Sequence, residues 1–161
     1  MKSTLTSAGL WFFIAAILYA VISGLLQDGP MRVTMETDAS GSLVIQRHRD
    51  GHFYVEAQLN GQPATLLIDT GATTLAISEE LADAAGLTRC RPQQSHTANG
   101  ITNTCSASLD ALQIGPVTLQ NVQTSVLPRL SGPGLLGMNV LQRFRMEQDG
   151  ETLRLTLRKE K

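Results

Sequence analysis

Aromatic side chains are scarce in this chain, and most of them lie near its N-terminus. Its 161 residues include one Trp, two Tyr and four Phe, or 4%. Four of these fall between positions 11 and 19, so the remainder keeps only Phe53, Tyr54 and Phe144. Proteins that stack on bases present aromatic rings along a groove. The composition therefore argues against a base-stacking or carbohydrate-stacking surface.

Charged residues are also sparse, and their signs nearly balance. Asp, Glu, Lys and Arg make up 17% of the chain, and the net charge is -1. A nucleic-acid-binding domain normally carries a clear excess of Lys and Arg. We therefore expect no nucleic-acid partner.

Several cofactor and metal motifs are missing. The sequence has no phosphate-binding loop, no dinucleotide-binding fingerprint and no Cys-x-x-Cys pair. His48 and His52 are four residues apart, but Gly51 and the strand-like pattern around them argue against a helical metal pair. We expect solvated histidines there, and neither a cofactor nor a metal.

One long run without charge is present, from Ala8 to Leu26 (AGLWFFIAAILYAVISGLL). As a helix it would span about 28 Å at about 1.5 Å per residue, close to the roughly 30 Å hydrocarbon core of a bilayer. A cleaved signal peptide is the alternative, but its apolar region is usually about 7–15 residues and ends in a small-x-small site. We expect a tail at 1–7 and an uncleaved transmembrane anchor at 8–26, crossing the inner membrane once, with the following domain in the periplasm.

Small residues recur along this run. Ala8, Ala16, Ala20 and Gly24 fall on one stripe, which Phe12 interrupts. Such a stripe lets two membrane helices approach closely, although Ala and Gly are common in these helices in any case. The stripe therefore has two interpretations: a contact through which two helices dimerise, or the ordinary frequency of Ala and Gly in membrane helices.

The rest of the sequence predicts a small β domain. Residues 27–42 are polar, contain Gly, Pro and Ser and lack periodicity, so we expect a linker there and a domain over 43–161. Ser78–Ala85 is the one convincing helix, with Ser78 as its N-cap. Many short strands with one helix indicate a small closed or sandwiched β domain. The expected strands lie at 43–47, 53–59, 64–68, 106–114, 117–119, 122–127, 144–148 and 152–158.

The most informative segment is LLIDTGATT, residues 66–74, in which an apolar strand leads directly into Asp69. A carboxylate at the end of a buried strand is costly unless it is hydrogen-bonded or functional. Gly71 permits a sharp turn whose amide can point at that carboxylate. Asp69 could instead be an ordinary turn residue.

A second segment, GLLGMNVL at 134–141, places two apolar residues and a Gly before a short helical turn. Taken alone, it reads as a buried strand that ends in a turn. A third segment, HTANGIT at 96–102, lies between these two in the sequence.

Together these segments resemble the retropepsin-like aspartic proteases of clan AA, in particular their bacterial membrane-anchored branch. The resemblance covers about residues 53–157 and includes the helix SEELADAAGL. It implies a mainly β, closed barrel-like acid protease fold with one short helix. The site residues that it implies are Asp69 as catalytic carboxylate, Thr70, Gly71 and Ala72 in the active-site turn, Ala98, Asn99, Gly100 and Ile101 in a flap over the substrate, and Leu135, Leu136 and Gly137 in a supporting loop.

Two features depart from that pattern. Thr73 stands where many retroviral members carry Asp, and the flap has a single Gly and no aromatic residue. Both departures bear on how the flap closes and how the substrate is held.

A single Asp-Thr-Gly implies a homodimer. Aspartic protease chemistry needs two carboxyl groups that share one proton, of which one activates water and the other polarises the peptide carbonyl. We therefore expect two Asp69 residues to meet across a two-fold axis, with a peptide or unfolded protein as substrate. The other Asp residues lie in linker, helix or turn contexts, and none repeats the motif: Asp28, Asp38, Asp50, Asp83, Asp110 and Asp149.

Cys90 and Cys105 are the only cysteines, and they flank the flap-like segment. In an exported domain they could form a disulfide; two free, partly buried thiols are the alternative. The sequence thus predicts a membrane-anchored, homodimeric aspartic endopeptidase. A catalytically silent protease-like module that binds a peptide by strand addition is the alternative.

Overall fold

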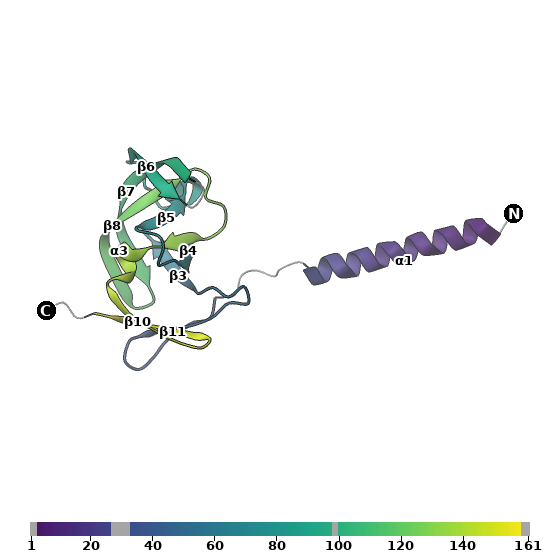
Figure 1. Cartoon of the computed structure of the whole chain (residues 1–161), viewed down its shortest axis with the longest axis horizontal. Coiled ribbons are helices and arrows are strands. Elements are labelled where there is room, and N and C mark those ends of the chain that lie inside the picture. Colours follow the sequence, from purple (N-terminus) through teal and green to yellow (C-terminus); the bar gives the residue numbers. More distant parts are fainter. Residues whose placement is uncertain (1–2, 27–32, 98–99, 159–161) are drawn as a thin grey trace. The chain divides into compact units, whose positions relative to one another are not determined.

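The computed structural model describes residues 3–26, 33–97 and 100–158, shown in Figure 1. The chain divides into two units, Met1–Arg32 and Val33–Lys161, and each is described by itself.

The first unit holds the helix α1 (Ser3–Leu26). This helix contains no charged residue, and its large apolar side chains from Trp11 to Ile22 are exposed. Within the described part of the chain, no helix has both the length and the apolar character needed to cross a membrane. The structure therefore does not confirm the transmembrane anchor predicted at 8–26.

The second unit is built mainly of strands, and six of them form a closed ring. β7 pairs back with β3 through Ala57↔Ile114 and two further residue pairs, which closes the ring. This closure confirms the prediction of a mainly β, closed barrel-like fold. In ring order the strands are β3 (Tyr54–Leu59), β4 (Gln62–Ile68), β9 (Gly134–Leu136), β5 (Leu75–Ser78), β8 (Val117–Leu127) and β7 (Gly100–Ile114).

A hairpin extends from this ring. β6 (Arg91–Thr97) pairs antiparallel with the first part of β7, and only with β7 among the described strands. We term β6 together with residues 100–106 the flap hairpin. Ala98 and Asn99, which separate the two strands in the sequence, lie outside the described residues.

Four strands form a second, antiparallel sheet in the order β1 (Met35–Thr37), β2 (Leu43–Gln46), β11 (Thr152–Leu157) and β10 (Phe144–Asp149). This sheet shares one buried core with the barrel: Ile45, Phe144 and Leu155 belong to the same cluster as Leu59 and Leu112. The domain therefore includes both sheets.

The predicted linker boundary is wrong, because the domain begins at Val33 rather than at residue 43. β1 lies inside the segment predicted as linker and pairs with β2 in the register Met35↔Ile45. A three-residue edge strand that buries Met35 only partly carries too little apolar periodicity to be recognised in the sequence.

Local sequence explains most turns and caps. Asn60 (φ 49°) and Gly61 (φ 87°) both adopt positive φ, as the tight hairpin between β3 and β4 requires. The predicted helix is α2 (Glu79–Ala84), and the Ser78 hydroxyl accepts a hydrogen bond from the Leu81 N–H at 3.2 Å. A second short helix, α3 (Met138–Leu141), follows β9.

Two predicted strands, at 117–119 and 122–127, are one continuous strand, β8. Asn121 has a φ of 54° within it, and pairing with β7 continues on both sides of this residue. The two predicted strands left out Gln120 and Asn121, but β8 continues through both residues.

Asp38 organises the turn between β1 and β2. Its Oδ1 accepts hydrogen bonds from the N–H groups of Ser40 (2.9 Å) and Ser42 (3.0 Å). Its Oδ2 pairs with the guanidinium of Arg154 on β11. One carboxylate thus ties β1 to the rest of the sheet.

Asp38→Ala should lower the free energy of unfolding by about 1–3 kcal/mol, because the buried Ser42 amide and Arg154 lose their partner. Chemical denaturation measures this loss. Glu36→Ala, at an exposed position of the same segment, is the matched control and should change stability by less than about 0.5 kcal/mol. Equal stability of the two variants would contradict the role given to Asp38.

Candidate active site

β4 carries Asp69 to the rim of the barrel. It runs parallel to β9, with Leu67 opposite Leu135 and Ile68 opposite Leu136. The pairing continues one step further, since the Asp69 N–H donates to the Leu136 carbonyl at 3.1 Å. Leu136 is buried, whereas Asp69 is half-buried. The carboxylate therefore emerges where the apolar strand ends.

The active-site turn orients this carboxylate. The Gly71 N–H donates to Asp69 Oδ1 at 2.8 Å, and the Ala72 N–H donates to the Asp69 carbonyl at 3.3 Å. A Cβ at position 71 would lie 3.1 Å from Asp69 Oδ1, so glycine lets the amide approach closely. Thr70 is exposed.

The loop after β9 braces the turn from behind. The N–H of Met138 donates to the Ala72 carbonyl (2.8 Å), and that of Asn139 donates to the Thr73 carbonyl (3.0 Å). A Cβ on Gly137 would lie 2.3 Å from the Thr74 carbonyl oxygen, so no other residue fits here without moving the backbone. The structure thus places Gly137 against the turn that bears Asp69.

Asn139 is a further member of this support that the sequence analysis did not single out. Its Oδ1 accepts from the Leu75 N–H at 2.9 Å, and its Nδ2 donates to the Gln123 carbonyl at 2.8 Å. One amide therefore links the end of the active-site turn to β8. The sequence did offer a signal for this role: Asn139 is an amide side chain among apolar residues, directly after Gly137-Met138.

The flap residues are only partly described. Gly100 begins β7 with a φ of 101° and pairs with Thr97 of β6. Ala98 and Asn99 lie outside the described residues, and of Ile101 only the backbone is described. The flap role of these four residues stays a prediction.

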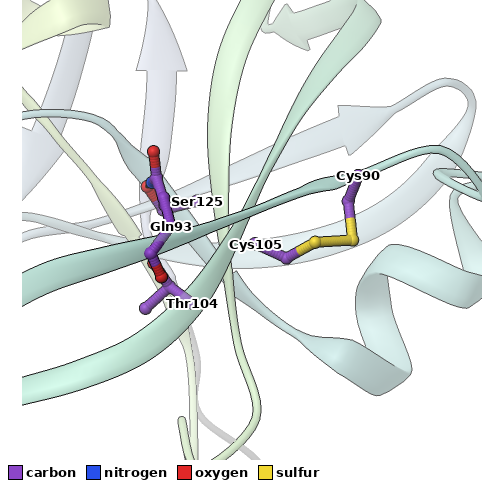
Figure 2. Close-up of a disulfide and its surroundings, with 5 residues drawn as sticks. All are labelled: Cys90, Gln93, Thr104, Cys105 and Ser125. Carbon is purple, nitrogen blue, oxygen red and sulfur yellow. A yellow bond between two sulfur atoms is a disulfide. The ribbon is translucent and has the colours of Figure 1, made fainter.

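A disulfide joins Cys90 to Cys105, with their Cα atoms 5.4 Å apart. Figure 2 shows it at the base of the flap hairpin, beside the pairing of β6 with β7. Of the two states that the sequence left open, the structure therefore contains the disulfide.

The connection between β2 and β3 lies beside the site, since the Ile68 N–H donates to the Phe53 carbonyl at 2.9 Å. Asp50 organises it: its carboxylate accepts hydrogen bonds from the Tyr54 hydroxyl (2.7 Å) and the His52 N–H (2.9 Å). His48 Nδ1 lies 3.1 Å from Asp50 Oδ2, so this histidine is paired rather than solvated as expected, while His52 is exposed.

These contacts set the charge of the connection. Burial acts to raise the pKa of Asp50, but the hydrogen bonds from His52 and Tyr54 and the neighbouring His48 outweigh it and lower that pKa to about 2. Burial and the hydrogen bond to Asp50 raise the pKa of Tyr54 to about 12. At neutral pH, Asp50 is therefore an anion that accepts a hydrogen bond from the neutral phenol of Tyr54.

Among the residues that the structure describes, no three His, Cys, Asp or Glu side chains gather as a metal site.

The site contains one catalytic candidate per chain. Among the described residues, the Asp69 side chain is hydrogen-bonded to the Gly71 amide and to no second carboxyl group. The other described aspartates belong to different elements: Asp38 before β2, Asp50 before β3, Asp83 in α2, Asp110 in β7 and Asp149 in β10.

Comparison with known proteins agrees with this geometry. The family described as gag-polyprotein putative aspartyl protease matches residues 55–143. A solved retropepsin-like aspartic protease from Rickettsia conorii matches with a TM-score of 0.64 and 33% identity, over 78% of this chain and 96% of that one. The chain therefore belongs to the family of retropepsin-like aspartic proteases.

Two curated relatives are similar to this chain at the sequence level. An uncharacterized protein from the cobV 5′ region of a Sinorhizobium species is 32% identical over 134 residues, which is 80% of this chain and 56% of that protein. An uncharacterized protein of Rickettsia prowazekii is 32% identical over 108 residues, 65% of this chain and 46% of that protein. The chain thus spans about half the length of these relatives.

Gly137→Ala should disturb the site more than the fold. The added methyl would push the Thr74 carbonyl away and cost about 1–3 kcal/mol of stability, as overpacking typically does. The displaced turn should also lower any Asp69-dependent cleavage by at least about tenfold, because small misplacements of reacting groups are costly. Thermal unfolding and cleavage rates measure the two effects.

Gly150→Ala is the matched control. Gly150 has a φ of 54° and open space around its Cβ direction, in a turn on the other sheet. It should lose about 1 kcal/mol through backbone strain alone and keep its cleavage rate. If both variants lost cleavage in proportion to stability, the bracing role of Gly137 would be wrong.

Proposed function

We propose that this protein is an aspartic endopeptidase whose active site forms between two copies of the chain. The observation that carries the proposal is Asp69, presented at the end of β4 and oriented by the Gly71 amide in a turn that Gly137 braces. Membership of a family of aspartic proteases supports the same chemistry.

The proposed reaction needs a carboxyl group in each protonation state. Two acidic groups a few ångströms apart do not both ionise, so they share one proton. The ionised Asp69 takes a proton from water, whose oxygen attacks the peptide carbonyl carbon, while the protonated Asp69 of the partner subunit donates a hydrogen bond to the carbonyl oxygen. The C–N bond then breaks, and the leaving nitrogen takes up a proton.

Dimerisation follows from the count of carboxylates. Each described domain places one Asp69 at the rim, and a two-fold axis supplies the identical group from a second copy. We propose a peptide or an unfolded protein as substrate, because the family to which the chain belongs is one of aspartic proteases.

Asp69→Asn should abolish cleavage. The amide oxygen of the substituted side chain should still accept the hydrogen bond from Gly71, so the fold and the dimer should persist. The substituted side chain can, however, neither hold nor donate the proton that the two carboxyl groups share. We expect cleavage of an unfolded protein to fall by at least about 10²–10⁴-fold, with a bell-shaped pH profile in the parent. Cleavage assays and sedimentation measure the two properties.

Asp110→Asn is the control, because it makes the same substitution at an exposed position of β7. It should leave cleavage unchanged. Retained cleavage in purified Asp69→Asn protein would refute the assignment. Peptide binding without turnover in the parent would instead favour the silent peptide-binding module.

We also propose that residues 8–26 attach the protein to the inner membrane, with the domain in the periplasm. The absence of charge in α1 and the exposure of its apolar side chains support attachment, because such a surface requires a cover. The Cys90–Cys105 disulfide supports an oxidising compartment. Confinement to a membrane would raise the local concentration of monomers, and the Ala8/Ala16/Ala20/Gly24 stripe remains a candidate contact.

Ile17→Lys should move part of the full-length protein from the membrane fraction into the soluble fraction, because a lysine at the centre of a span costs about 2.5–3.5 kcal/mol. Carbonate extraction of membranes measures the distribution. Gln120→Lys, at an exposed position of β8, should leave the distribution unchanged. Parent protein found entirely in the soluble fraction would contradict membrane attachment.

A further inference from the structure

A buried hydroxyl lies between the flap hairpin and the active-site turn. Ser125 is near the C-terminal end of β8 and is only 7% exposed, although it is polar. Its Oγ lies 2.9 Å from Thr74 Oγ1 and accepts a hydrogen bond from Gln93 Nε2 at 3.3 Å. An unpaired buried hydroxyl would be costly, so these two partners account for the burial of Ser125.

Gln93 reaches Ser125 by crossing a strand. It belongs to β6, and β7 lies between β6 and β8 in the sheet. Its backbone pairs with Thr104 of β7, and the Thr104 hydroxyl donates to the Gln93 carbonyl at 3.4 Å. Figure 2 shows the Gln93 side chain beside Ser125 and its backbone beside Thr104. One residue therefore contacts both the hairpin and the barrel.

The other end of this chain of contacts is part of the site. Thr74 closes the active-site turn, and its carbonyl is the group against which Gly137 packs. The next N–H, that of Leu75, donates to Asn139. The contact sequence Gln93–Ser125–Thr74 thus ends on the loop that holds Asp69.

The disulfide fixes the adjacent row of the hairpin. Cys105 pairs with Pro92 in the β6–β7 register, and the next row is Gln93 with Thr104. The disulfide joins the two strands of the hairpin to each other. The β7 side of the hairpin is held to the barrel through Cys105↔Val126 and Ser106↔Ser125, whereas β6 pairs only with β7 among the described strands. The Gln93–Ser125 contact, one row further, therefore joins β6 directly to β8.

We propose that Gln93 is a positioning residue, which sets the direction in which the flap hairpin leaves the barrel through its contact with Ser125 and Thr74. Its kinetic consequence rests on the proposed peptidase function; the tether itself does not. A flap that contacts the bound chain stabilises the substrate and the transition state alike, so a displaced flap raises KM and leaves kcat nearly unchanged.

Gln93→Leu removes the donor with little change in size. We expect a KM about 3–10-fold higher, as one neutral hydrogen bond warrants, with kcat within about twofold of the parent. Gln94→Leu makes the same substitution at the exposed neighbouring position of β6 and should change neither constant. Gln93→Glu should restore KM, because its carboxylate can accept from the Ser125 hydroxyl while Thr74 donates to Ser125.

Hydrogen exchange tests the tether without any need for cleavage. In Gln93→Leu the amides of β6 should exchange faster than in the parent, and in Gln94→Leu they should not. Ser125→Ala should produce the same increase, and adding Gln93→Leu to it should increase exchange no further, because both changes break one contact.

The outcomes separate the two proposals. Equal exchange in Gln93→Leu and Gln94→Leu, or additive effects of Gln93→Leu and Ser125→Ala, would overturn the tether. A fall in kcat with unchanged KM would overturn its role in flap position. If the parent protein cleaves nothing, the peptidase proposal fails, and the exchange comparison alone still decides the tether.

Discussion

The close passage of two distant segments at Gly137 is the constraint on which the site depends. The turn at 69–74 and the loop at 137–139 approach so closely that a single methyl at position 137 would meet the Thr74 carbonyl oxygen at 2.3 Å. The parallel pairing of β4 with β9 brings them there, and parallel neighbours require a long crossover. In this chain the crossover contains β5, β8 and the flap hairpin. The barrel is thus the scaffold that lets these two short segments meet.

In the proposed enzyme, this arrangement separates a braced turn at Asp69 from the flap hairpin, which would cover the substrate. Backbone hydrogen bonds from Met138 and Asn139 and the Asn139 amide hold the turn. The flap hairpin leaves the sheet next to the Cys90–Cys105 disulfide and the Gln93–Ser125 contact. Catalytic groups gain from preorganisation, whereas a cover has to admit and release a chain. Restraint near the hairpin base, by the disulfide and by Gln93, would meet both needs in the proposed enzyme.

Sequence patterns predicted the parts of this structure that are local. The Asn60-Gly61 hairpin and the Ser78 cap follow from neighbouring residues. The many short strands predicted a closed or sandwiched β domain, and family resemblance supplied the closed barrel and the roles of the Asp69 and Gly137 segments. β1 was taken for linker, and β5 was not predicted as a strand, because each has only three or four residues. Gln93, Asn139 and Ser125 act through partners 16 to 64 positions away, and no local pattern encodes such pairs.

A site assembled from two identical halves explains what the domain does and does not build around Asp69. In the proposed dimer both carboxylates have the same surroundings by symmetry, so the shared proton, rather than any local difference, makes one group an acid and the other a base. The domain then needs only to orient its carboxylate. The observed contacts do this. The Gly71 N–H donates to Asp69 Oδ1, the Asp69 N–H donates to the Leu136 carbonyl, and the loop after β9 braces the turn. The charged cluster around Asp50 lies in a different turn, where its hydrogen bonds hold the connection between β2 and β3.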